Sequence, residues 1–83
     1  MAGAALLAQG IDRRRAILRF VKGYAKKHGF APSMQEIAHA VESSKSAARY
    51  HVEQLVDEGY LSHTPGKYRS LVVVNEGRYP APR

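Results

Sequence analysis

The chain has 83 residues, with 13 Lys and Arg against 7 Asp and Glu, and no cysteine. A chain of this length holds one small hydrophobic core, and the lack of cysteine excludes disulfides and thiolate metal sites. The formal net charge of +6 favours a polyanionic partner such as nucleic acid. The lack of cysteine also suits a reducing compartment, so we expect a cytoplasmic protein. The apolar stretch near the N-terminus is too short to span a bilayer, so we expect no membrane partner.

The first predicted element is an amphipathic helix from Asp12 to His28, which Gly29 ends. We expect residues 1–11 to form a flexible leader or the frayed start of this helix. The side predicted to face the core carries Ile17, Leu18, Val21, Tyr24, Ala25 and His28. The opposite side fits either a solvated surface or one that contacts phosphate, and it carries Arg15, Arg19, Lys22 and Lys26.

The next two helices are predicted from their start signals. Ser33 is followed three residues later by Glu36, the pattern of a capping box, which opens a short helix over residues 34–41. After a short turn, Ser44 caps a third helix over residues 45–58, and Gly59 ends it. A turn this tight makes the two helices cross steeply, which is the geometry of a helix-turn-helix.

A change of period after Gly59 predicts a small antiparallel β-hairpin. The segment YLSH can pair with RSLVVV across TPGKY, where Pro65 and Gly66 favour a turn. Residues 76–83, with one Gly and two Pro, are predicted to form a flexible tail or linker. The expected fold is therefore mainly α with a small β-hairpin, and the folded domain occupies residues 12–75.

The third predicted helix has a core side and an outward side suited to nucleic acid. Ala48, Val52 and Leu55 share one side and are predicted to face the core. The outward side of the first two turns carries small or hydrogen-bonding side chains, which can approach base edges; these are Ser46, Ala47, Arg49 and Tyr50. Ser44 and the amide groups at the helix start can also meet a phosphate.

The charges of this helix run against its dipole. Lys45 and Arg49 stand near the start and Glu53 and Asp57 near the end, whereas the dipole favours acids first and bases last. This order suits a helix that enters DNA by its N-terminus, because the positive end then meets phosphate while the acids stay away from the backbone.

A second basic element is the hairpin, with Lys67 and Arg69 at or beside its tip and Tyr68 between them. Hairpin tips are often basic for solubility, but here the tip follows a candidate recognition helix. The set expected to contact the DNA backbone is therefore Ser33, Lys45, Lys67, Tyr68 and Arg69.

The segments PSMQEIAHAV and SKSAARYHVEQLVDEGYL, followed by a turn and a β run, resemble the N-terminal DNA-binding domain of the LexA repressors over residues 12–74. The resemblance implies a winged helix-turn-helix of three helices and a two-stranded antiparallel wing. It also implies base contacts from Ser44, Ser46, Ala47, Arg49 and Tyr50. The expected function is sequence-specific binding of double-stranded DNA by a transcriptional repressor, with two copies on a palindromic or repeated site.

Two departures from the LexA pattern limit what the resemblance implies. The best-known members carry acidic residues at the positions of Arg49 and Tyr50, so we expect a different operator. The chain also has no room for the self-cleaving domain of LexA. We therefore carry over neither regulation by DNA damage nor the catalytic residues.

Other classes of function fit the residues less well. The histidines stand on separate segments, without the i, i+3 or i+4 pairing of metal-binding helices; they are His28, His39, His51 and His63. The sequence shows no Gly-rich phosphate loop, so we expect no enzyme activity, metal, cofactor or small-molecule substrate. Two alternatives stay open, a winged helix that docks proteins and a nucleic-acid-binding protein without sequence preference.

Overall fold

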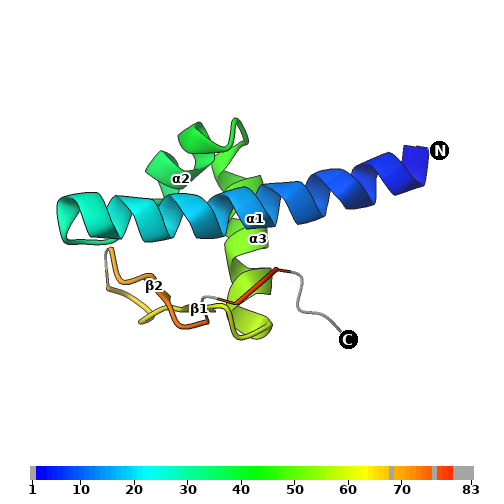
Figure 1. The fold of residues 1–83 in the computed structure, drawn as a ribbon. Helices are drawn as coiled ribbons and strands as arrows, with labels where there is room; N and C mark the ends of the chain where they lie inside the picture. Colours follow the sequence, from blue (N-terminus) through cyan, green and yellow to red (C-terminus); the bar gives the residue numbers. More distant parts are fainter. Residues whose placement is uncertain (1, 68, 76, 80–83) are drawn as a thin grey trace.

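The computed structural model of the protein describes residues 2–67, 69–75 and 77–79, and the side chains from residue 10 onward. In chain order the elements are α1 (Ala2–His28), α2 (Met34–Ala40), α3 (Lys45–Asp57), β1 (Leu61–Ser62) and β2 (Val72–Val73). Helix α1 crosses the front of the molecule, α3 runs behind it almost at a right angle, and the hairpin lies below (Figure 1). The fold is a winged helix-turn-helix, mainly α with a two-stranded antiparallel wing, as predicted.

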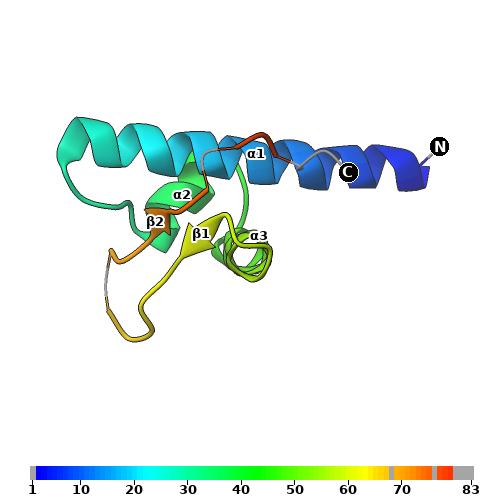
Figure 2. The same ribbon diagram turned by 60° about the horizontal axis from the view of Figure 1, so that its bottom comes forward.

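All the other elements pack on one side of α1 (Figure 2). The core between them is apolar, and its members from α1, α2, α3, β1 and the segment before β2 include Ile17, Val21, Ile37, Ala38, Ala48, Val52, Leu55, Leu61 and Leu71. The periodicity therefore predicted the inward sides of the three helices correctly. His28 is an exception, because it is exposed at the end of α1 and its ring packs against that of Tyr24, with 4.2 Å between the centroids.

Helix α1 is longer than predicted, because it begins at Ala2 and not at Asp12. Residues 2–11 are therefore the start of the helix and not a flexible leader. Alanine, leucine and glutamine are strong helix formers, and the two glycines of this segment, Gly3 and Gly10, cost the helix at most about 1 kcal/mol each. The added turns extend α1 well beyond the rest of the molecule (Figure 1).

The helix boundaries follow local signals. The Ser33 hydroxyl accepts a hydrogen bond from the Glu36 amide at 3.2 Å, and the Glu36 carboxylate accepts one from the Ser33 amide at 2.7 Å. These two bonds form the predicted capping box of α2. Gly29 and Gly59, which follow α1 and α3, have positive φ angles of 80° and 85°, a conformation that glycine adopts without strain.

The hairpin pairs as predicted but is short. Leu61 lies opposite Val73 and Ser62 opposite Val72. At the tip, the Ser70 hydroxyl accepts a hydrogen bond from the Thr64 amide at 3.1 Å and donates one to the Thr64 carbonyl at 3.2 Å. The wing is therefore held by backbone pairing at its base and by Ser70 nearer its tip.

The tail predicted over residues 76–83 is partly ordered against the core. Tyr79 is only 5% exposed, and its ring packs edge-on against Tyr60 with 4.9 Å between the centroids. The Tyr79 hydroxyl donates to Glu58 Oε1 at 2.9 Å and accepts from Arg14 Nη1 at 3.2 Å. A flexible tail was therefore the wrong prediction for residues 77–79, while residues 76 and 80–83 lie outside the described part.

Within the described part, no helix combines the length and apolar character needed to cross a bilayer.

Candidate nucleic-acid interface

The outward side of α3 carries the residues predicted to contact bases. Ser46, Arg49 and Tyr50 are exposed, Tyr50 by 54%, and Ala47 is half-buried. On the inward side, Ala48, Val52 and Leu55 are buried and fix the rotation of the helix. The first two turns of α3 thus present an arginine, a tyrosine and two small side chains on one surface.

The N-terminus of α3 is capped by Ser44, whose hydroxyl accepts a hydrogen bond from the Ala47 amide at 3.1 Å. The first turn of α3 contains no acidic residue, and its last turn contains no basic one. Glu53 and Asp57 are exposed near the far end. The charge order of the helix is therefore as the sequence indicated, and Ser44 has a structural role besides the predicted contact with DNA.

A groove of about 410 Å³ lies between the starts of α2 and α3 and the wing. Its lining brings together residues that are far apart in the sequence, namely Ser33, Lys45, Arg49, Lys67 and Arg69. His63 and Gln35 also line it, and its described lining includes no acidic side chain. Four of the five residues expected to contact the backbone, together with Arg49, therefore surround one basic groove, while Tyr68 lies outside the described residues.

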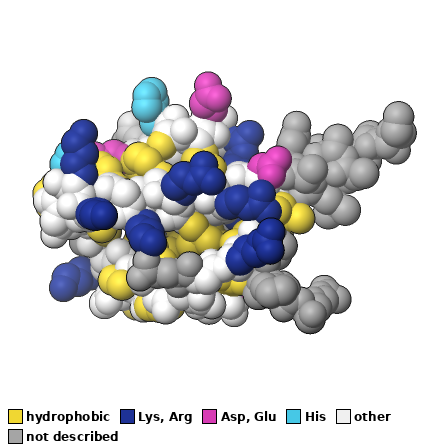
Figure 3. Space-filling model, in the orientation of Figure 1, with side chains coloured by type: hydrophobic (Ala, Val, Ile, Leu, Met, Phe, Trp, Pro, Cys, Tyr) yellow, Lys and Arg dark blue, Asp and Glu magenta, His cyan; other side chains and the backbone are white. Residues whose placement is uncertain are grey.

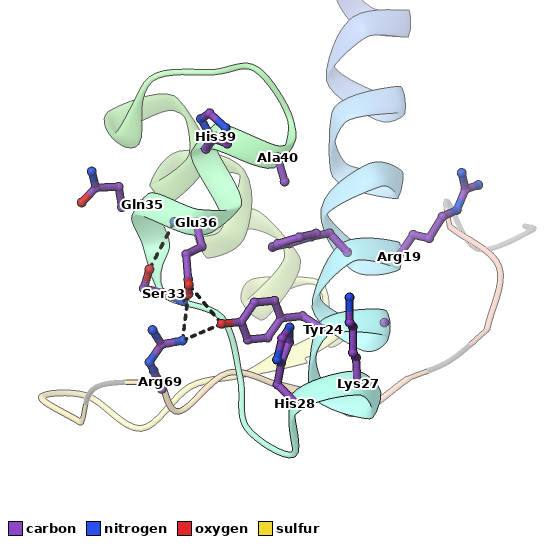
Figure 4. A pocket seen from close by; sticks show the side chains of 12 residues that line it. Arg19, Tyr24, Lys27, His28, Ser33, Gln35, Glu36, His39, Ala40 and Arg69 are labelled. Carbon is purple, nitrogen blue, oxygen red and sulfur yellow. Dashed lines mark hydrogen bonds and ion pairs between the residues drawn. The ribbon is translucent and has the colours of Figure 1, made fainter.

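Arg69 has intramolecular partners that the sequence did not reveal. Its Nη1 atom lies 2.8 Å from Glu36 Oε1 and 3.0 Å from the Ala31 carbonyl oxygen. Its guanidinium group also stands 5.0 Å from the centre of the Phe30 ring. Figure 4 shows Arg69, Glu36 and Tyr24 joined beside the start of α2. Arg69 thus ties the wing to the helix-turn-helix, and its predicted contact with DNA stays a prediction.

Glu36 joins three parts of the molecule. Its carboxylate caps α2 through Ser33, pairs with Arg69 of the wing, and accepts a hydrogen bond from the Tyr24 hydroxyl of α1 at 3.0 Å. The Ser33 amide first, and then Arg69, stabilise the charged form and lower the pKa of Glu36 to about 2. The capping pattern predicted the bond to Ser33, but no sequence signal indicated the other two.

A second polar cluster ties α1 to α3 on the inner side. Arg14 Nε donates to His51 Nδ1 at 3.2 Å, and Arg14 Nη1 donates to the Tyr79 hydroxyl at 3.2 Å. Burial, and then the charges of Arg14 and Arg13, lower the pKa of His51, so the neutral ring that accepts this bond is favoured. The sequence indicated that His51 packs near the core, and the structure adds its partner.

The histidines do not gather into a metal centre. Among the described residues there is no group of three or more His, Cys, Asp or Glu side chains that could hold a metal ion. His39 and His63 are exposed on α2 and in the hairpin. The polar clusters around Glu36 and Arg14 consist of hydrogen bonds and ion pairs that hold the fold together.

A capped, exposed helix after a tight turn, with a basic wing beside its N-terminus, defines the class of winged helix-turn-helix DNA-binding domains. The family model described as the LexA DNA binding domain matches residues 10–70. The chain belongs to this family.

Similar proteins include LexA repressor 2 of Geobacter sulfurreducens, 32% identical over 69 residues that make up 82% of this chain and 34% of that protein. The LexA repressor of Limosilactobacillus reuteri is 31% identical over 80% of this chain and 32% of its own length. That of Anaeromyxobacter dehalogenans is 34% identical over 81% of this chain and 30% of its own length. The chain thus spans about a third of the length of these relatives.

Proposed function

We propose that this protein binds double-stranded DNA at a specific sequence and represses transcription. Helix α3 enters the major groove by its N-terminus, and the wing lies against the sugar-phosphate backbone. The observation that carries this proposal is the basic groove, where Lys45, Arg49 and Lys67 come together from α3 and the wing. The repressor names of the relatives support the regulatory part of the proposal.

The proposed roles divide between base contacts and backbone contacts. Arg49 is suited to a bidentate contact with guanine, and small residues such as Ser46 and Ala47 let the helix approach the base edges. Tyr50 is the only large exposed ring on this side of the helix within the described part. The base-contacting set is Ser44, Ser46, Ala47, Arg49 and Tyr50, and the backbone set is Ser33, Lys45, Lys67, Tyr68 and Arg69.

The proposed unit is one domain that covers a few base pairs, so useful affinity requires two copies on neighbouring half-sites. Selection of bound sequences from a pool of random duplexes tests the function directly. We expect one enriched motif with internal symmetry. Enrichment of no sequence would favour a protein-docking domain or a nucleic-acid-binding protein without sequence preference.

Two single substitutions separate base contacts from backbone contacts. Arg49→Ala should weaken binding to the selected site by about 1–3 kcal/mol and relax the preference at one base pair. Lys67→Ala should weaken binding to all duplexes alike and lower the slope of log K against log salt by about one. Fluorescence anisotropy titrations on selected and scrambled duplexes at several salt concentrations measure both. An equal loss on both duplexes from Arg49→Ala would exclude its role in base recognition.

A further inference from the structure

A second basic surface lies on the side of α1 that faces away from the core. Four cations stand there at positions i, i+4, i+7 and i+11, and we call this set the basic ridge: Arg15, Arg19, Lys22 and Lys26. All four are exposed. At 1.5 Å per residue the ridge is about 17 Å long. Lys and Arg side chains gather along the same face in Figure 3, where α1 lies in front of α3.

The basic ridge is not explained by the stability of α1. Its neighbours three or four residues apart all carry the same charge, and such pairs destabilise a helix by about 0.2–0.5 kcal/mol each. Asp12 is the single acid in the sequence of α1, and it pairs with Arg15 at 3.7 Å at one end of the ridge. A helix side that serves only solubility normally mixes the two signs of charge.

A groove of about 510 Å³ runs beside the ridge, between α1 and residues 73, 75 and 77–79. Arg15, Arg19 and Lys22 form one wall, and Arg78 stands in the opposite segment. The described lining contains no acidic side chain, and its large apolar side chains, Leu18, Val73 and Tyr79, are partly or fully buried. Arg15 is held in place, since its Nε donates to the Tyr79 carbonyl at 3.0 Å.

These features fit a nucleic acid better than a protein partner. A protein interface needs an apolar centre with a polar rim, whereas the apolar side chains of this surface, Leu18 and Val73, are only partly exposed and lie between cations. A row of cations about 5 Å apart along a helix matches a linear polyanion, whose binding energy comes mainly from counterion release. We propose that the basic ridge and its groove bind the phosphate backbone of a second DNA duplex, so that one chain can join two duplexes.

The two DNA surfaces cannot share one short duplex. Helix α3 lies behind α1 in Figure 1, and Lys and Arg side chains gather on the near face in the same orientation (Figure 3). The smallest extent of the molecule is 23 Å. DNA is stiff over about 150 base pairs, so one short duplex does not wrap around a body of this size without a large bending cost. This inference rests on the proposed function, because the first duplex occupies α3.

The test is a capture experiment with two duplexes. A duplex carrying the selected motif is immobilised and saturated with the protein, free protein is washed away, and a soluble fluorescent duplex of random sequence is added. The wild-type complex should retain the fluorescent duplex. In the double variant Arg19→Gln/Lys22→Gln, retention should fall by about fivefold and its salt slope by about two, because each phosphate contact contributes about 0.9.

Lys27→Gln is the control for removing a positive charge from α1 outside the ridge. Lys27 is exposed on the same helix but lines the pocket between α1 and α2 instead of the groove beside the ridge. It should leave retention unchanged, and circular dichroism should show that all the variants keep their helical content. Binding of the first duplex should change less than twofold in the double variant.

Three outcomes would overturn the second site. They are no retention by the wild type, equal retention by the wild type and the double variant, and displacement of neither duplex by salt. If Arg49→Ala leaves the first duplex bound while the double variant releases it, then the first duplex binds to α1 and not to α3, and the proposed function is rejected. If instead the wild type binds the first duplex through α3 but does not retain the fluorescent duplex, then only the second site is rejected.

Discussion

At the scale of single residues, Glu36 makes both a local contact within α2 and a long-range contact with the wing. It caps α2 through Ser33 and pairs with Arg69 of the wing, 33 positions further along the chain. Arg69 itself has a positive φ angle of 55°, a conformation that costs a non-glycine residue free energy unless its surroundings hold it. The bonds to Glu36 and to the Ala31 carbonyl oxygen therefore hold the wing in its observed orientation.

The pH dependence of stability should report on Glu36. Its pKa in the folded protein is about 2, below the usual 4.5, so the folded state favours the ionised carboxylate. The stabilisation should be complete above about pH 4.5 and should disappear as the pH falls toward 2, because the unfolded chain binds the proton first. Thermal unfolding of the wild type and of Glu36→Gln across this range measures the effect. A constant difference in melting temperature between the two proteins would contradict this assignment.

The sequence predicted the contacts made within a few residues and missed those made across the chain. The Ser33–Glu36 capping box was visible because both partners belong to one helical turn. The bonds of Glu36 to Tyr24 and Arg69, and of Arg14 to His51, depend on how the elements pack. No pattern in a single sequence gives that packing, so their partners could not be assigned in advance.

At the scale of elements, α3 combines a good cap with an unfavourable charge order. Ser44 supplies the cap, while Lys45 and Arg49 occupy the positive end of the dipole and Glu53 and Asp57 the negative end. Such an arrangement is expected where DNA binding, and not the stability of the helix, selects the residues. The prediction of α3 from sequence was correct to within one residue, because its cap and its terminal glycine are both local signals.

Substitutions at Ser44 separate the effect of this residue on stability from its effect on DNA binding. Ser44→Ala should lower the free energy of unfolding by about 1 kcal/mol, because the Ala47 amide loses its side-chain acceptor. Ser44→Asp keeps the cap and adds a negative charge that the dipole favours, so stability should be retained or rise. The same charge should weaken DNA binding by repelling phosphate. Urea unfolding and anisotropy titrations of both variants measure this, and tighter DNA binding by Ser44→Asp would contradict N-terminal entry of α3.

The boundaries of α1 and of the C-terminal segment show where sequence patterns fail. The period of α1 is clear from Asp12 onward, whereas Ala and Leu before it carry helix propensity without an amphipathic pattern, and the helix nevertheless begins at Ala2. In the C-terminal segment, a single tyrosine among Gly and Pro gave no periodic signal. Its burial follows from contacts with residues far away in the sequence, namely the Tyr60 ring and the side chains of Arg14 and Glu58.

At the scale of the whole molecule, Tyr79 closes the domain by joining its first and last helices. It contacts Tyr60, hydrogen-bonds with Arg14 and Glu58, and its carbonyl oxygen holds Arg15. Tyr79→Ala should destabilise the domain by about 3 kcal/mol, as for other buried aromatic residues. Tyr79→Phe should lose much less, because the ring packing remains. Urea unfolding measures both, and equal losses would assign the stabilisation to the hydroxyl group.

The number of chains bound to DNA follows from the size of the domain. One α3 helix spans only a few base pairs, and a small protein with a net charge of +6 repels its own copies in solution. We therefore expect a free monomer at micromolar concentration and two chains on a duplex that contains the full selected motif, with half-sites one or more helical turns apart. Sedimentation velocity of the protein alone, and then with duplexes carrying one or both half-sites, measures the stoichiometry.

Inserting five base pairs between the half-sites should abolish cooperative binding, because it turns the second half-site to the opposite side of the DNA double helix. If cooperativity survives this insertion, the copies interact through a flexible connection and not through a fixed geometry on DNA.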